Sequence, residues 1–216
     1  MGRTESFDFD GPAGRLEAIL MWPDRPPEAA AVVCHAHPLH GGVMHFKPVF
    51  RTARALQLAN VAALRFNFRG VGRSEGLHDQ GRGEQEDVRA ALAEVARRVE
   101  GVPLLVGGFS FGSVMALRVA ARDSEVQSAF ALGFPAAMVQ DLDFLQEVRV
   151  CRLFVQGEHD EFAPATRIRE LVEMMPQPHR LVIVPGSDHY FAGKLDVLQS
   201  AVQAWASERP WRHCPS

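Results

Sequence analysis

The chain alternates short apolar runs with longer amphipathic stretches, and this alternation constrains its fold more than any other feature. Runs such as 29–34 and 126–132 are apolar almost throughout, as in strands that are buried on both faces. Between them, apolar residues recur at helical spacing, as at Val49, Ala53 and Leu56. The pattern predicts strands at 7–9, 16–22, 29–34, 61–68, 103–107, 126–132, 150–155 and 181–184, and helices at 44–59, 86–99, 111–121, 165–175 and 195–206.

Repeated strand–helix units with buried strands predict a parallel sheet covered by helices on both faces. The first two strands are separated by Gly11-Pro12 and Gly14, so they are expected to form an antiparallel hairpin at one edge. We therefore predict an α/β fold, an α/β/α sandwich with about eight strands, mostly parallel, and an antiparallel N-terminal edge. Residues 1–216 are expected to form one domain, with a loose C-terminal tail from about 210 to 216.

Charge and cysteine content narrow the functional classes. The chain has 23 Lys and Arg against 26 Asp and Glu, a net charge of −3, so we expect no nucleic-acid or membrane partner. It has no apolar segment of the roughly 18 residues that a spanning helix needs, and its start lacks the apolar core of a signal peptide. Cys34, Cys151 and Cys214 are few and far apart, as expected for reduced thiols. We expect a cytoplasmic protein.

A candidate nucleophile follows the fifth predicted strand. That strand runs directly into Gly108-Phe109-Ser110-Phe111-Gly112, and a predicted helix begins at once. A G-x-S-x-G turn between strand and helix exposes its serine, and the free N–H groups of the helix start face the charge that develops during attack. A glycine-rich turn without catalysis is the alternative, and we predict that Ser110 is the nucleophile.

A serine needs a base, and the base needs an orienting acid. In hydrolases of this architecture the acid and then the histidine follow the serine along the chain. Asp160 lies in the loop after strand 150–155, and His189 lies in the loop after strand 181–184, so both are expected near Ser110. The competing residues are Glu158, Glu161, Asp141 and Asp143 for the acid, and His159 and His179 for the base.

Four motifs together make the sequence resemble the α/β-hydrolase superfamily over nearly its whole length, and more narrowly the small lidless bacterial serine hydrolases. The motifs are His35-Ala36-His37-Pro38-Leu39-His40-Gly41-Gly42, Phe68-Arg69-Gly70-Val71-Gly72-Arg73-Ser74-Glu75-Gly76, the 108–112 turn, and Gly157, Asp160 and Pro164 leading to Asp188-His189. The resemblance implies an oxyanion hole in which one donor is the backbone N–H of Phe111. The second donor comes from the loop after the third strand, where Pro38 has no N–H. Leu39 is expected to provide it, with His37 as the alternative.

The histidines at 35, 37, 40 and 45 also allow a different reading, since H-x-H at a strand end is used by metal-dependent hydrolases. A zinc site would need acidic or further ligands that the string lacks, so we expect no metal and no cofactor. Instead, His35 or His37 is expected to hydrogen-bond to backbone and fix the oxyanion donor. The 69–76 loop is expected to be a structural turn rather than an anion site, since it lacks a phosphate-loop pattern.

The predicted reaction is two-step acyl transfer on carboxylic esters with short or medium acyl chains. A thioesterase, a serine peptidase or an acyltransferase would use the same triad. A metal-dependent hydrolase using His35, His37 and His40 and a non-catalytic binding protein are alternatives from other classes. The partner is expected to be a small-molecule ester, and monomer and homodimer both stay open.

Length bears on substrate access. Only 17 residues separate Leu132 from Val150, too few for a helical cap, so we expect an open site. An apolar rim is predicted from five side chains, with core packing as the alternative for each: Phe46, Phe134, Met138, Phe144 and Phe191.

Overall fold

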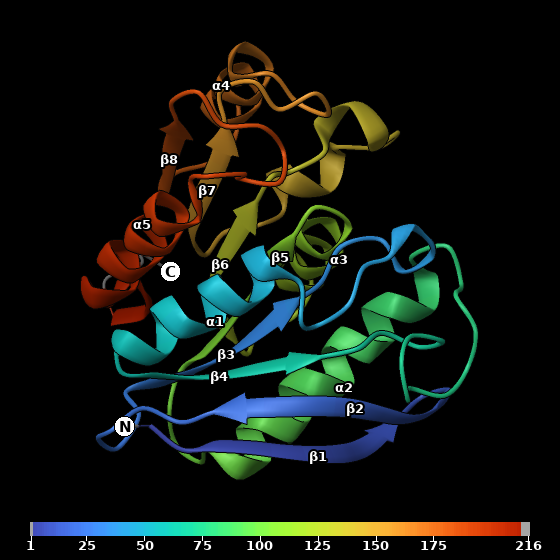
Figure 1. Cartoon of the computed structure of the whole chain (residues 1–216). Helices are drawn as coiled ribbons and strands as arrows, with labels where there is room; N and C mark the ends of the chain where they lie inside the picture. The colour runs from blue at the N-terminus through green and yellow to red at the C-terminus, as the bar shows by residue number, and fades with distance from the viewer. Residues whose placement is uncertain (1, 213–216) are drawn as a thin grey trace.

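The computed structural model describes residues 2–212 and is built around one eight-stranded sheet (Figure 1). The strands are β1 (Thr4–Gly11), β2 (Gly14–Met21), β3 (Ala29–Cys34), β4 (Val61–Phe66), β5 (Leu104–Phe109), β6 (Val126–Leu132), β7 (Cys151–Gly157) and β8 (His179–Val184). The helices are α1 (Lys47–Leu58), α2 (Arg82–Arg98), α3 (Phe111–Ala120), α4 (Ala165–Glu173) and α5 (Leu195–Ser207). Short 3₁₀ helices lie at Pro38–His40 (η1), Ala136–Met138 (η2), Asp143–Gln146 (η3) and Pro210–Arg212 (η4).

The strand order is β1-β2-β4-β3-β5-β6-β7-β8. The hairpin of β1 and β2 pairs antiparallel, and β2 also pairs antiparallel with β4. All other neighbours are parallel, from β4 with β3 across to β7 with β8. The predicted fold class is therefore confirmed, including the antiparallel N-terminal edge.

Helices cover both faces of the sheet. In Figure 1, α1 and α5 lie in front of it, while α2 and α3 lie behind. The strand sequences explain why both faces are covered: along β3, Ala30 and Val32 belong to the apolar cluster shared with α2, α3 and α4. The alternate residues Ala31 and Val33 belong to the cluster shared with α1 and α5. Successive side chains of a strand point to opposite faces, so an all-apolar strand needs a layer on each side.

The C-terminal end differs from the predicted loose tail at residues 210–212. These residues form η4, and the Trp211 ring is buried in the same cluster as Trp205 and Phe130. Burying a large aromatic ring stabilises the segment that carries it, which the proline-rich sequence did not indicate. Residues 213–216, including Cys214, lie outside the described residues.

The structure also bears on two expectations from the sequence, the lack of a membrane-spanning helix and the state of the cysteines. Within residues 2–212, no helix has both the length and the apolar content needed to cross a bilayer. Cys34 is a buried free thiol, and burial raises its pKa well above its ordinary value. A buried thiol with a raised pKa stays protonated, so Cys34 packs as a small apolar side chain.

Candidate active site

Ser110 lies at the sharp turn between β5 and α3. Its backbone has φ 54° and ψ −122°, a region that non-glycine residues rarely occupy. The turn is tight because the chain approaches β3 closely: a Cβ on Gly108 would lie 2.6 Å from the Cys34 carbonyl oxygen. A Cβ on Gly112 would collide with the His35 carbonyl oxygen. Both glycines are therefore required by packing, and the result is a half-buried serine at the carboxyl edge of the sheet.

The structure brings Ser110, His189 and Asp160 into one hydrogen-bonded chain. His189 Nε2 lies 3.0 Å from Ser110 Oγ, and His189 Nδ1 lies 2.7 Å from Asp160 Oδ2. Asp160 is 1% exposed and His189 is 2% exposed. With its proton on Nδ1 donated to the carboxylate, the imidazole presents Nε2 as an acceptor for the serine hydroxyl. The geometry is that of a nucleophile, a base and an orienting acid.

Asp160 is held by more than its histidine. Gln156, at the end of β7, donates from Nε2 to Asp160 Oδ2 at 2.8 Å, and the Phe162 N–H donates to Asp160 Oδ1 at 2.8 Å. Gln156 is itself fixed, because its Oε1 accepts the Phe134 N–H at 2.8 Å. Sequence reasoning missed Gln156. Its signal was a polar residue at the buried end of a strand, four positions before the acid.

The competing acids and bases lie elsewhere. Glu158 and His159 are exposed, and Glu158 accepts the Gly186 N–H. His179 begins β8, and its Nδ1 faces the Pro176 carbonyl at the opposite end of the sheet from Ser110. The remaining candidates are exposed: Glu161 and Asp141 lie in loops, and Asp143 is the first residue of η3.

The backbone N–H groups of Phe111, Leu39 and His37 are the ones that bear on the predicted oxyanion hole. Phe111 is the first residue of α3, and its N–H has no hydrogen-bond partner within residues 2–212, as expected at a helix start. The Leu39 N–H instead donates to His37 Nδ1 at 3.2 Å, and Leu39 is 70% exposed and does not line the cavity beside Ser110. The Leu39 N–H is therefore engaged within its own loop. The His37 N–H has no partner in the described part of the chain, and His37 does line that cavity.

His35 anchors the loop that follows β3. Its Nδ1 lies 2.7 Å from the Ala36 carbonyl oxygen, and the Phe68 N–H donates to its Nε2 at 3.0 Å. Burial lowers the pKa of His35 to about 4, although the hydrogen bond to Ala36 acts in the opposite direction. Both ring nitrogens are occupied by backbone, so His35 has no lone pair to offer a metal ion. The residue connects the loop after β3 to the loop after β4.

Three further imidazoles form a cluster at the edge of the site. The His37 ring is stacked on His40 at 4.5 Å between centroids and lies 4.9 Å from His78. Burial lowers the pKa of His37, with smaller contributions in the same direction from His40 and His78 and an opposing one from Glu84. His78 Nδ1 lies 2.7 Å from the buried Glu84 carboxylate. Within residues 2–212, no three His, Cys, Asp or Glu side chains are arranged to hold a metal ion.

The 69–76 loop is a structural turn, as the sequence favoured. Arg69 forms a buried two-pronged ion pair with Asp87 on α2. Arg73 pairs with Asp8 and lies near Glu17. Because both guanidinium groups are engaged by carboxylates, the loop offers no free cation to an anion.

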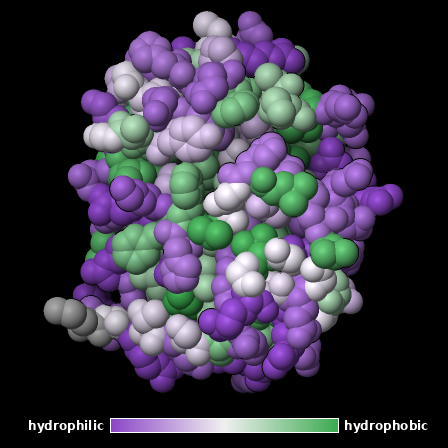
Figure 2. Space-filling view, turned by 45° about the vertical axis from the view of Figure 1, so that its right-hand side comes forward, coloured by the Kyte–Doolittle hydropathy of each residue, from purple (hydrophilic) through white to green (hydrophobic). Residues whose placement is uncertain are grey.

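A cavity of about 690 Å³ opens beside Ser110 and is lined largely by apolar and aromatic side chains. Of the predicted rim residues, Phe46 and Met138 line it. Phe134, Phe144 and Phe191 do not, because they are buried in the two cores. The connection between β6 and β7 contains only η2 and η3, so no helical cap covers the cavity in the described chain. Figure 2, a view turned by 45° from that of Figure 1, shows hydrophobic side chains in separate groups among hydrophilic ones.

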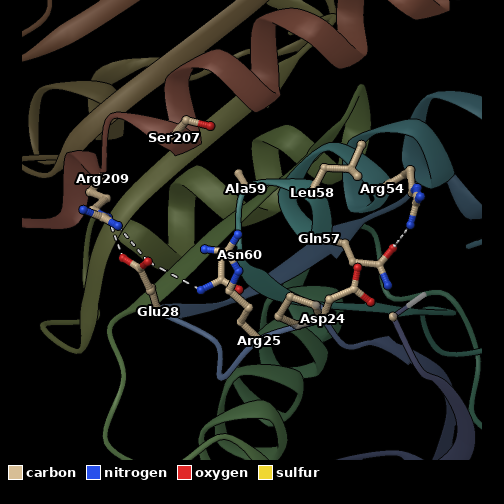
Figure 3. A pocket seen from close by; sticks show the side chains of 12 residues that line it. Asp24, Arg25, Glu28, Arg54, Gln57, Leu58, Ala59, Asn60, Ser207 and Arg209 are labelled. Carbon is tan, nitrogen blue, oxygen red and sulfur yellow. Dashed lines mark hydrogen bonds and ion pairs between the residues drawn. The ribbon is translucent and has the colours of Figure 1, made fainter.

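A second cavity, of about 320 Å³, is unrelated to this chemistry (Figure 3). Its polar side chains bind one another: Glu28 accepts from Arg209 and Asn60, and Arg54 donates to Gln57. No histidine lines it. Ser110 and His189 line the cavity beside Ser110 and not this one.

Comparison with known proteins agrees with this geometry. Residues 29–207 match the profile of the alpha/beta hydrolase domain family. The chain belongs to the α/β-hydrolase family. The match spans every described strand from β3 to β8 and all five helices. The resemblance inferred from the motifs is therefore confirmed at the level of the family.

Solved structures give the same result for this α/β hydrolase. An α/β serine hydrolase homologue from Coxiella burnetii is 34% identical, with a TM-score of 0.87 and coverage of 93% of this chain and 96% of the other. A serine hydrolase without a lid from Xanthomonas campestris is also 34% identical at TM-score 0.87, covering 99% and 96%. An uncharacterized protein of Rickettsia prowazekii is 32% identical over 202 residues, 90% of this chain and 85% of that protein. These likenesses support hydrolase activity and an uncapped fold.

Proposed function

We propose that this α/β hydrolase cleaves carboxylic esters of short or medium acyl chain through a Ser110–His189–Asp160 triad. The observation that carries the proposal is the continuous chain from Ser110 Oγ to His189 Nε2 at 3.0 Å and from His189 Nδ1 to Asp160 Oδ2 at 2.7 Å. Hydrolase relatives at 34% identity support the reaction class. The substrate is proposed to be a small molecule.

The reaction proceeds in two halves. His189 Nε2 accepts the Ser110 proton while Oγ attacks the ester carbonyl, and the imidazolium then donates that proton to the departing alcohol. Water attacks the acyl-enzyme in the second half while His189 takes its proton, and the carboxylic acid leaves as the imidazolium returns that proton to Ser110 Oγ. Asp160 keeps the imidazole in the required tautomer and stabilises its charged form. Gln156 and the Phe162 N–H hold Asp160 for that task.

The oxyanion is proposed to be held by the N–H groups of Phe111 and His37. Both residues line the cavity, and neither N–H is engaged elsewhere within residues 2–212. The Leu39 N–H instead supports the loop by bonding to the His37 ring. The His35 ring fixes the same loop through its hydrogen bonds to the backbone of Ala36 and Phe68. Preorganised donors of this kind usually make the largest contribution to the rate.

The preference for short or medium chains follows from the shape of the cavity. Its lining is apolar near Ser110, with Phe46 and Phe109 on one side and Val114 and Met115 on another. The short η2–η3 connection leaves it uncovered. An open apolar cavity binds modest acyl groups but does not enclose a long chain.

The experiment is a comparison of Ser110→Ala with Ser124→Ala on p-nitrophenyl butyrate. Ser124 is an exposed serine in the loop after α3, so its variant is the matched control. We expect kcat to fall by at least about a thousandfold in Ser110→Ala, because the nucleophile is gone while binding persists. The control should retain the wild-type rate. A Ser110→Ala protein as active as its control would refute the assignment.

A further inference from the structure

Part of the lining of the active-site cavity comes from α3. Phe111, Val114, Met115 and Arg118 all line the cavity, and their spacing places them on one face of the helix. The first three are apolar, and the fourth carries a charge. Arg118 lies eight positions beyond Ser110, about 12 Å along the axis at the rise of an α-helix. Side chains lean toward the N-terminus of their helix, which shortens the gap between the guanidinium and the serine.

Another part of the cavity lining surrounds the base, His189. The His189 ring contacts Phe109 at 5.0 Å and Tyr190 at 5.2 Å between centroids, and both of these residues line the cavity. The departing alcohol receives its proton from His189, so it must face this part of the lining. The acyl chain can then lie along the apolar face of α3, toward Arg118.

Arg118 is held in place by neutral groups. Its Nη2 donates to the Asp141 backbone carbonyl at 3.3 Å, and its Cζ lies 4.6 Å from the centroid of the Phe144 ring. The side chain is half-buried, and within residues 2–212 it forms no ion pair. The Asp141 carboxylate also borders the cavity, but its Oδ1 accepts the Asp143 N–H.

The other arginine in the cavity differs in this respect. Arg82 also lines the cavity, but it pairs with the Asp79 carboxylate at 3.0 Å and is largely exposed. Arg118 is therefore the cavity-lining guanidinium, among the described residues, that lacks a carboxylate partner. A guanidinium stacked on a ring keeps several N–H donors in a fixed plane, which suits a carboxylate.

From these contacts we propose that Arg118 binds a carboxylate at the far end of the acyl chain. The substrate class is then monoesters of dicarboxylic acids, with an apolar spacer lying on Val114 and Met115. This inference rests on the proposed esterase activity and specifies the acyl group of its substrate. The terminal carboxylate receives charge-assisted hydrogen bonds from Arg118 while the ester carbonyl is placed at Ser110.

The test compares two p-nitrophenyl esters with the same eight-carbon acyl chain, the octanoate and the suberate monoester. They differ only in a terminal methyl or carboxylate. The readout is the ratio of kcat/KM for suberate to that for octanoate, which divides out any loss of folded protein. We expect this ratio to fall about tenfold in Arg118→Gln, the effect of losing a hydrogen bond to a charged group. Added salt should lower the wild-type ratio as well.

Arg122→Gln is the matched control, because Arg122 lies one turn further along the chain, is exposed and does not line the cavity. Its ratio should equal that of the wild type. The same ratio in Arg118→Gln and in the wild type would overturn the assignment of Arg118 while leaving the esterase proposal standing. An equal fall in Arg122→Gln would also overturn it, since the effect would then be general surface charge. A wild-type protein that cleaves neither ester would refute the esterase proposal and this inference together.

Discussion

Replacing His35 with glutamine should flatten the pH dependence of stability. His35 is buried, and its pKa in the folded protein is lowered to about 4 from an ordinary value of 6.5. As the pH falls below 6.5, the unfolded chain takes up a proton at this position that the folded protein does not. Stability from the neutral buried imidazole is therefore complete above pH 6.5 and is lost as the pH falls toward 4.

The size of the effect follows from the two pKa values. Between pH 7 and pH 5, proton uptake by His35 in the unfolded chain lowers the free energy of unfolding by about 2 kcal/mol. Glutamine does not titrate, and its amide retains a donor and an acceptor for the Ala36 carbonyl and the Phe68 N–H. The variant should therefore lose about 2 kcal/mol less than the wild type over this pH range.

The assay is urea denaturation at pH 7, 6 and 5, followed by tryptophan fluorescence, since Trp205 and Trp211 are buried and report unfolding. The control is His45→Gln, an exposed histidine in the same loop. All other titrating groups are common to the proteins, so the difference between their pH slopes isolates His35. Identical slopes in the wild type and His35→Gln would refute the reasoning, as would an equal change in His45→Gln.

Three further predictions concern the site. Asp160→Asn should lower kcat by about four orders of magnitude at neutral pH, because the amide favours the wrong imidazole tautomer. A decrease in kcat of less than about tenfold on p-nitrophenyl butyrate would contradict this. Leu39→Pro removes an N–H that bonds to the His37 ring and that the proposed oxyanion hole does not use. Its kcat should fall less than about tenfold, whereas loss of an oxyanion donor costs a hundredfold or more. Gln156→Leu removes a donor to Asp160 and leaves the Phe134 N–H unpaired, so kcat and the thermal midpoint should both fall; unchanged values of both would refute the positioning role.

The fold was largely predictable because buried strands and amphipathic helices carry their pattern locally. Strands 29–34 and 126–132 were predicted at their observed bounds. Helix starts were less predictable. The apolar stripe of α2 begins near Val88, but the helix begins at Arg82, because the Glu84 carboxylate accepts the Gly81 N–H and holds the first turn. Such polar contacts leave no periodic signal.

In contrast to α2, helix α1 begins later than predicted, at Lys47 and not at Met44. The Met44 N–H donates to the Asn67 side chain at 2.7 Å, which ties this residue to the loop after β4. Pro48 fits the start of a helix, where its missing N–H costs nothing. Periodicity extended the helix too far because Phe46 falls on its apolar face, although that ring borders the cavity.

In the site, the order of Ser110, Asp160 and His189 along the chain was enough to predict that they meet. The engagement of the Leu39 N–H was not predictable, because it depends on how the His37 ring lies against η1. The sequence also did not distinguish side chains that line the cavity from side chains in the core. Phe46 and Phe134 are both phenylalanines, and only the fold determines that Phe134 is buried.

The measurement that tests the central claim most directly is labelling with a fluorophosphonate, followed by mass spectrometry of the modified peptide. The reagent reacts with an activated serine and not with ordinary hydroxyl groups. The triad predicts a single adduct, on Ser110, that is lost in His189→Ala because the base is gone. An unlabelled wild-type protein, an adduct on another serine, or equal labelling of His189→Ala would contradict it.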